Sequence, residues 1–355
     1  MQTIRRVLYF IAIFAVSIGM SFGISQRARA VTINITYDSS VSTAPAGFTT
    51  TVNSVASQLD SLFTNPIDIN INVGWGEVDG QALQANAIGE SIGLYYNNAP
   101  YTTVAHDLTL TDSAASNSSV AHQAAQNIPT TSPIVNSLSI TSAEAKAIGA
   151  VSNSTATDGY VGFDSSYSYT FNSTTSIAPG TYDFTGLVFH ELTEIMGRTG
   201  MLPSTCTSST GSSYSCIAQT PLDLFRYSAP GTLDTNSPGS SNYFSVNGGQ
   251  TVINTFNTVS GADYGDWAGA SANAFNAFIG STGTVQPFTT GDLEELNALG
   301  YQTSATAYTT VAAENSSSVP EPSSTLFLII GALLCSLGLV RRDNPLQAKF
   351  ESLPA

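Results

Sequence analysis

Apolar and polar residues alternate in two stretches near the start of the chain. Residues 31–38, VTINITYD, and residues 66–78, PIDININVGWGEV, place apolar side chains at every second position, which is typical of strands. Between them, residues 46–65, AGFTTTVNSVASQLDSLFTN, repeat apolar positions at spacings of three and four, which indicates a helix. The opening pattern therefore predicts strand, helix, strand.

The rest of the pattern is shorter and more broken. It predicts short helices at 121–128 and 142–149, a strand at 160–171, a helix at 181–198 and a final helix at 289–301. Asp183 is expected to be the N-cap of the helix at 181–198, and Gly197 with Gly200 is expected to end that helix. Beyond that helix come loops rich in Ser, Gly and Asn with short strands. The order predicts an α+β fold with a twisted mixed sheet.

Composition narrows the class of protein. The chain has 355 residues and a formal net charge of -15, yet only 10% of residues are charged. A chain without a basic patch cannot neutralise phosphates, so nucleic-acid binding is not expected. We expect one lobe at 31–198, a loop-rich lobe at 199–303 and a linker at 304–319.

The first segment, 1–30, has the order of a secretory signal. Arg5 and Arg6 precede an apolar run, and Ala28-Arg29-Ala30 forms a small-residue cleavage site. The alternative is an uncleaved membrane anchor. Either reading predicts that the body of the protein is exported.

The last segment has a second apolar run. Residues 324–340 are followed by Arg341 and Arg342, which favours a membrane segment with the body of the protein outside. With Pro320-Glu321-Pro322 before it, segment 320–342 resembles a PEP-CTERM sorting signal, which implies processing by an exosortase-like sorting peptidase. A plain single-pass anchor is the alternative, and a tail at 343–355 follows the arginines. The expected location is the cell envelope or the extracellular space.

Cysteine usage agrees with export. The predicted mature body keeps two cysteines, Cys206 and Cys216. In an oxidising compartment we expect these two to form a disulfide. Metal binding by reduced cysteines is the alternative, but no second Cys or His pair accompanies them.

The helix at 181–198 carries the candidate chemistry, in the motif His-Glu-x-x-Glu. His190 and Glu194 are four residues apart, so they differ by about 40° around the helix and about 6 Å along it. Both can reach one cation, and Glu191 can act on a water beside it. The alternative is an amphipathic helix with a solvated polar face. A carboxylate in the ligand set makes zinc the first expectation and also admits calcium or manganese.

A third ligand must come from elsewhere. Asp223 in PLDLFRYSAPG is our candidate, although an Asp between apolar neighbours is usually a cap or ion-paired. Asp263 and Asp266 in GADYGDWAG are the next candidates, and they could instead bind calcium. His106 and His122 are expected on the surface.

Both arginines of the predicted body lie in the segments already singled out. Arg198 either favours the negative end of its helix or clamps a carboxylate at the site. Arg226 and Tyr227 either hold Asp223 or stabilise an oxyanion. An ion pair between the second lobe and the helix is an equally good reading of Arg226.

The segments HELTEIMGR, PLDLFRYSAPG, FSVNGGQTVINTFN, GADYGDWAG and DLEELNALGY together resemble a family of secreted bacterial zincin-like metalloproteases, many with a PEP-CTERM tail. The resemblance implies a metzincin-like α+β fold and peptidase activity. It departs from the His-Glu-x-x-His pattern, and the metzincin position for a third ligand is occupied by Gly200.

The sequence thus predicts an exported zinc-dependent endopeptidase that acts on proteins or peptides. His190, Glu194 and Asp223 would bind zinc, Glu191 would activate the attacking water, and Tyr227 would assist. Arg198 and Arg226 would support the site. The alternative is a non-catalytic surface or matrix protein that binds metal or polysaccharide on the same scaffold.

Overall fold

The computed structural model describes residues 30–116, 118–133, 137–171, 175–201, 204–207, 213–216, 219–234, 242–259, 262–269, 271–280 and 282–317. The predicted signal segment, apart from its last residue, and the predicted sorting segment and tail lie outside these ranges. Within the described ranges, no helix has both the length and the apolar character needed to cross a bilayer.

We call residues 31–198 the first lobe and residues 199–303 the second, as names for the two stretches of chain. The first contains a four-stranded mixed sheet. Its strands are β1 (Thr32–Tyr37), β2 (Asp68–Trp75), β3 (Gly89–Gly93) and β6 (Gly159–Phe163), in the spatial order β1-β2-β6-β3. The first three in that order run parallel, and β3 pairs antiparallel with β6 at the edge. The alternating apolar residues predicted for β2 are buried on one face, as expected for a half-buried strand.

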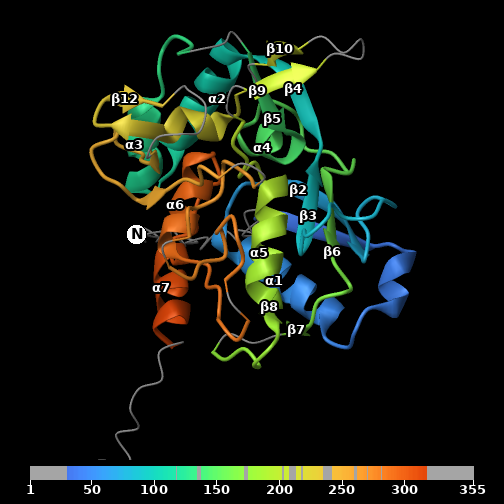
Figure 1. Ribbon diagram of the computed structural model, residues 1–355. Helices are drawn as coiled ribbons and strands as arrows, with labels where there is room; N and C mark the ends of the chain where they lie inside the picture. Colours follow the sequence, from blue (N-terminus) through green and yellow to red (C-terminus); the bar gives the residue numbers. More distant parts are fainter. Residues whose placement is uncertain are drawn as a thin grey trace, which may run out of the picture.

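Two helices pack on this sheet. These are α1 (Phe48–Leu62) and α5 (Phe184–Ile195), and α5 stands beside β3 in the centre of Figure 1. Phe48 of α1 makes ring contacts with Phe163 and Phe184, so sheet and helices share one aromatic core. Asp183 caps α5 by accepting a hydrogen bond from the backbone N–H of Thr185. The predicted cap is confirmed.

The remaining elements surround this core. The helices are α2 (Tyr101–Ala114), α3 (Ser119–Asn127), α4 (Ser142–Ala147), α6 (Thr290–Ala298) and α7 (Ala307–Ser317), with 3-10 helices η1 (Ser39–Thr43) and η2 (Pro221–Phe225). Small paired strands are β4 (Tyr95–Pro100) with β5 (Ser137–Thr141), β7 (Tyr169–Thr170) with β8 (Tyr182–Asp183), and β9 (Ser204–Thr207) with β10 (Ser213–Cys216). The second lobe holds β11 (Arg226–Ala229), β12 (Thr232–Leu233), β13 (Tyr243–Phe244) and β14 (Asn254–Thr255).

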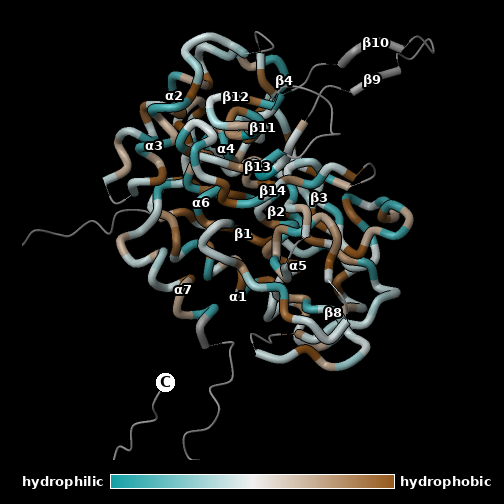
Figure 2. The backbone as a smooth tube through the Cα atoms, turned by 60° about the vertical axis from the view of Figure 1, so that its left-hand side comes forward, coloured by the Kyte–Doolittle hydropathy of each residue, from teal (hydrophilic) through white to brown (hydrophobic). Residues whose placement is uncertain are grey.

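The structure is mixed α+β, as predicted at that level. Apolar stretches recur along most elements in Figure 2 rather than forming one continuous segment. The predicted helices at 121–128, 142–149 and 289–301 correspond to α3, α4 and α6.

Two predictions about elements were wrong. The single strand expected at 160–171 is broken into β6 and β7, because the carboxylate of Asp164 accepts a hydrogen bond from the backbone N–H of Ser166 and forms a turn. The linker expected at 304–319 contains helix α7. Ala307 and Val311, one turn apart, are both buried against the core, so this segment contributes to the fold.

Candidate metal site

Helix α5 places the side chains of His190 and Glu194 on the side of the helix that faces a cavity. His190 Nε2 lies 3.2 Å from Glu194 Oε1, one helical turn further on. The other ring nitrogen, Nδ1, lies 2.8 Å from the carbonyl oxygen of Ala274. A carbonyl can only accept, so Nδ1 carries a proton, and Nε2 is the nitrogen that can offer a lone pair to a metal ion once its own proton is displaced.

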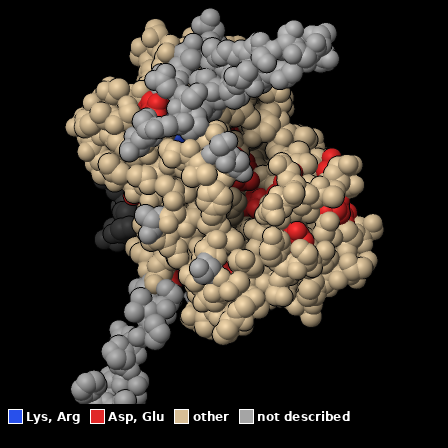
Figure 3. Space-filling model, in the orientation of Figure 1, with Lys and Arg blue, Asp and Glu red and all other residues tan. Residues whose placement is uncertain are grey.

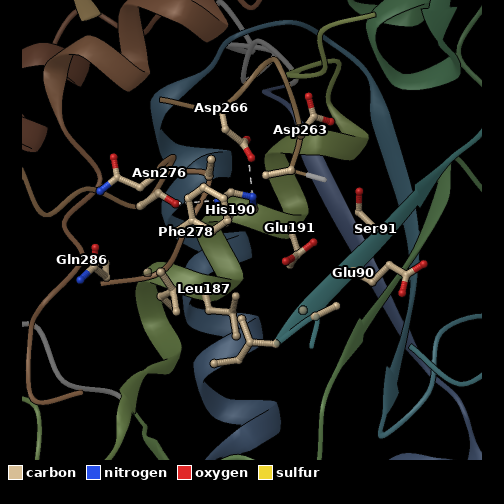
Figure 4. A pocket seen from close by; sticks show the side chains of 18 of the residues that line it. Glu90, Ser91, Leu187, His190, Glu191, Asp263, Asp266, Asn276, Phe278 and Gln286 are labelled. Atoms are coloured by element: carbon tan, nitrogen blue, oxygen red, sulfur yellow. Dashed lines mark hydrogen bonds and ion pairs between the residues drawn. The ribbon is translucent and has the colours of Figure 1, made fainter. Parts of the chain in front are cut away.

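Asp266 of the second lobe completes the group. Its Oδ1 lies 3.6 Å from His190 Nε2, and one donor atom from each of His190, Glu194 and Asp266 falls within 4.8 Å of the others. Figure 4 shows Asp266 directly above the His190 ring, joined to it by a dashed line. One nitrogen and two carboxylate oxygens at this spacing form a group that could hold a metal ion. In the part of the chain that the structure describes, it is the single group of three such side chains.

Arg198 contacts all three residues of this group. Its guanidinium donates to Asp266 Oδ1, lies 3.4 Å from Glu194 Oε1, and donates to the backbone carbonyl of His190 at 3.0 Å. It is fully buried and lies over the ring of Phe275. The clamp predicted for Arg198 is what the structure shows. Its fixed donor fork holds the two carboxylates beside the imidazole.

Glu191 lies between this group and the edge strand. It is 4% exposed, and it lines the same cavity. A Cβ at Gly89 of β3 would come within 2.3 Å of Glu191 Oε1, so the glycine makes room for the carboxylate. Figure 4 shows Glu191 pointing from α5 toward β3, next to His190. The expected base is therefore at the predicted place.

The group opens into a cavity of about 800 Å³. Residues 84–91 line one side, α5 lines the floor, and the loops at 262–266 and 273–279 line the other side. On the face in Figure 3, acidic atoms gather in a hollow near the positions of α5 and β3, and Lys and Arg atoms are almost absent. A substrate could approach the group from this side.

The pKa values of the site reflect burial together with close charges of both signs. Burial alone would lower the pKa of His190, but the carboxylates of Asp266 and Glu194 outweigh it and raise that pKa to about 10. Burial opposes ionisation of Glu194 too, yet the charges on His190 and Arg198 bring its pKa down to about 2. Burial, then the charge on Glu194, raises the pKa of Glu191 well above its ordinary value. Burial and Asp266 raise the pKa of Asp263 to about 7.

The raised pKa values of Glu191 and Asp263 have two causes, burial and the neighbouring carboxylates. Four carboxylates meet here, and Arg198 and His190 compensate only part of their charge. A divalent cation on His190 Nε2 and the two carboxylates would supply the missing positive charge and favour the ionised form of the others. The residues present therefore fit a divalent metal ion.

Asp223, the expected third ligand, is not part of the site. It is the third residue of η2 and accepts hydrogen bonds from the backbone N–H groups of Thr220 and Met201, in a capping box with Thr220. Its Oδ1 lies 3.4 Å from Arg226 Nε. The prediction was wrong because Oδ2 is held by these local donors and Oδ1 faces the buried arginine, away from His190 and Glu194.

Arg226 and Tyr227 do not line the cavity. Arg226 is fully buried over the ring of Phe256 and donates to the carbonyl oxygen of Tyr264, two residues before Asp266. It thus supports the loop that carries Asp266. Its ion pair is with Asp223, as one alternative expected, and not with the helix at 181–198 among the described residues. Tyr227 is buried in β11 against Gly249, so a catalytic role for it is not supported.

The other candidates fall in different places. Asp266 groups with His190 and Glu194 rather than forming a separate calcium site. Asp263, nearby in the same loop, accepts hydrogen bonds from the backbone N–H groups of Gly265 and Gly200. His106 and His122 are exposed, as predicted. The side chains of Cys206 and Cys216 lie outside those that the structure describes, so the disulfide stays a prediction. In the backbone, Cys206 pairs with Tyr214 and Cys216 with Ser204.

The sequence did carry a signal for the Asp266 loop. A Cβ at Gly200 would come within 2.7 Å of the backbone nitrogen of Gly265, and a Cβ at Gly265 within 2.6 Å of that of Gly200. The two glycines let the backbone after α5 touch the loop before Asp266. Gly200, at the position where metzincins have a third ligand, was thus a sign that two backbone segments approach each other closely.

Compared with family models, curated proteins and solved structures, the chain matches none. The resemblance to zincin-like proteases rests on the sequence segments quoted above.

Proposed function

We propose that this protein is a metal-dependent endopeptidase with a zincin-like arrangement, in which His190, Glu194 and Asp266 hold a zinc ion. The observation that carries the proposal is the convergence of these three donors, within 4.8 Å of one another, beside Glu191 in an open cavity. Three protein ligands with a fourth position open to the cavity are typical of catalytic zinc sites. When bound, the ion would act as a Lewis acid toward a water molecule and a carbonyl oxygen.

Glu191 is the base in this proposal. Its carboxylate lies in the cavity next to His190, where it can accept a proton from the attacking water and pass that proton to the departing amine. Burial holds its pKa high in the absence of a cation, and a nearby divalent charge favours the ionised form that a base requires. His190, Glu194 and Asp266 would stay fixed through Arg198 and the carbonyl of Ala274 during this transfer.

Peptides are the substrate class that the cavity favours. Strand β3 is at the edge of its sheet, and residues Ile88 to Ser91 line the cavity. An extended peptide could pair with the free edge of β3 and place a peptide carbonyl beside the metal ligands and Glu191. This mode uses backbone hydrogen bonds, so it suits cleavage within a polypeptide.

Cleavage of an unstructured protein tests the proposal. Zinc-loaded protein should produce new fragments, a chelator should abolish them, and added zinc should restore them. Zinc binding without any cleavage under these conditions would contradict the endopeptidase proposal and leave a metal-binding scaffold.

A further inference from the structure

The two oxygens of Glu194 have different partners. Oε1 faces the metal-site group, 3.2 Å from His190 Nε2. Oε2 accepts a hydrogen bond of 2.7 Å from the hydroxyl of Ser91, on edge strand β3. Oε1 also lies 3.4 Å from the Arg198 guanidinium. The carboxylate is therefore held so that Oε1 points at the group, while Ser91 on the other side engages Oε2.

Strand β3 keeps Ser91 in place. Ser91 pairs with Val161 of β6 in the antiparallel ladder, and Gly89 lies two residues before it on the same face of the strand. At Gly89 the absence of a Cβ accommodates Glu191, whereas at Ser91 a hydroxyl contacts Glu194. One face of β3 thus positions both acidic side chains of the helix motif.

The ligand set alone does not choose between metals. One imidazole and two carboxylates can bind zinc, but an oxygen-rich set also admits calcium or manganese. Zinc prefers few ligands in tetrahedral geometry. Calcium takes 6–8 oxygen ligands, commonly with a bidentate carboxylate. The number of oxygens that Glu194 can offer is therefore a means of selecting the metal.

We propose that Ser91 determines metal selectivity. By donating its hydroxyl hydrogen to Glu194 Oε2, it restricts Glu194 to monodentate binding through Oε1, which favours zinc over calcium. The inference rests on the proposed metal-dependent function. It assigns to Ser91 a role in metal choice that is separate from peptide cleavage.

Four variants test this inference. Ser91→Ala removes the hydroxyl. Ser91→Thr and Ser91→Val form a matched pair, because their side chains have nearly the same shape and only threonine can donate. Ser142→Ala is the control, since Ser142 donates to the carboxylate of Asp158 at 2.6 Å but does not contact the metal-site group. Thermal unfolding of each variant establishes that it is folded.

The readouts are zinc and calcium affinity, measured by competition with a chromophoric chelator, and the visible absorption of the cobalt(II)-loaded protein. We expect the zinc-to-calcium affinity ratio to fall about tenfold or more in Ser91→Ala and Ser91→Val, as for other residues that orient metal ligands. Their cobalt absorption should weaken, because additional oxygen ligands raise the coordination number. Ser91→Thr and Ser142→Ala should keep the wild-type ratio and spectrum.

An unchanged ratio and spectrum in Ser91→Ala and Ser91→Val would overturn the role of Ser91 while the zinc-dependent cleavage of the wild type still stood. An equal change in Ser142→Ala would also overturn it, since the effect would then be general. Failure of the wild type to bind zinc, calcium or cobalt would overturn both this inference and the proposed function.

Discussion

His190 donates from Nδ1 to the carbonyl oxygen of Ala274 and presents Nε2 to Glu194, 3.2 Å away. The backbone of the second lobe thereby fixes the tautomer of a side chain on a helix of the first lobe. This division of roles between the two nitrogens is usual for a metal-binding histidine. Metal binding at the site should therefore depend on pH through the protonation state of His190.

Zinc affinity should rise with pH in the range of about 5.5 to 7.5. Without metal, the pKa of His190 is raised to about 10 by Asp266 and Glu194 against the effect of burial, so the imidazole is protonated throughout this range. Metal binding must displace that proton, so the bound state holds fewer protons and higher pH favours it. We expect about a tenfold gain in affinity per pH unit for the proton lost from His190, and a steeper rise where Glu191 also ionises on binding, measurable by calorimetry in buffers of different ionisation enthalpy. A pH-independent affinity would show that His190 is not a ligand.

Glu191→Gln should separate chemistry from metal binding. The amide keeps the shape of the side chain but cannot accept the proton, so we expect cleavage to fall by roughly 10²–10⁴-fold. Zinc content should be unchanged because Glu191 is not one of the three ligands. Cleavage equal to wild type, with zinc bound, would exclude Glu191 as the base.

Gly89→Ala should impair cleavage through Glu191. The new methyl group would lie 2.3 Å from Glu191 Oε1, so the carboxylate must move. Zinc binding should persist, whereas the rate of cleavage should fall by at least tenfold, of the order seen when a catalytic group is misplaced. Gly291→Ala in α6 is the steric control, because its added methyl would meet no atom closer than 3.5 Å and its φ is not positive. If Gly89→Ala cleaves as fast as wild type, the carboxylate does not need its present position.

Replacing Arg198 should cost both stability and metal affinity. Arg198→Met removes a fully buried cation and leaves the carboxylate of Asp266 without its partner, which we expect to lower the free energy of unfolding by about 3–5 kcal/mol. Lys146→Met removes another buried cation, paired with Asp158 at 2.7 Å, and should cost a similar amount. Chemical denaturation measures the loss of stability in both variants, and chelator competition measures their zinc affinity.

Only Arg198→Met should also weaken zinc binding, because Arg198 contacts residues of the metal-site group and Lys146 does not. An equal loss of zinc affinity in both variants would mean that the loss follows from lower stability alone.

The helix that carries the site could be predicted because its signals are local. The spacing of His190 and Glu194, the cap at Asp183 and the apolar positions of α5 all lie within one short segment. The same holds for β1, α1 and β2, whose patterns repeat every two or about 3.6 residues. These elements were predicted nearly to their ends.

The third member of the group could not be assigned in this way. Asp266 lies 68 positions beyond Arg198, and it reaches the site only because the chain folds back at Gly200 and Gly265. We preferred Asp223 because its neighbours in the sequence are apolar, but they are apolar because η2 is buried, and Asp223 belongs to the capping box of that helix. Helix α2 was not predicted because Leu110 is exposed and threonines interrupt the apolar pattern.

The most direct test of the account is the zinc content of the purified protein, wild type and His190→Ala, measured by elemental analysis after removal of loosely bound ions. We predict one zinc ion per chain in the wild type, none in His190→Ala, and one in the control His106→Ala, whose histidine is exposed. Equal zinc content in the wild type and His190→Ala, or none in the wild type after incubation with zinc, would contradict the assignment of His190 as a zinc ligand.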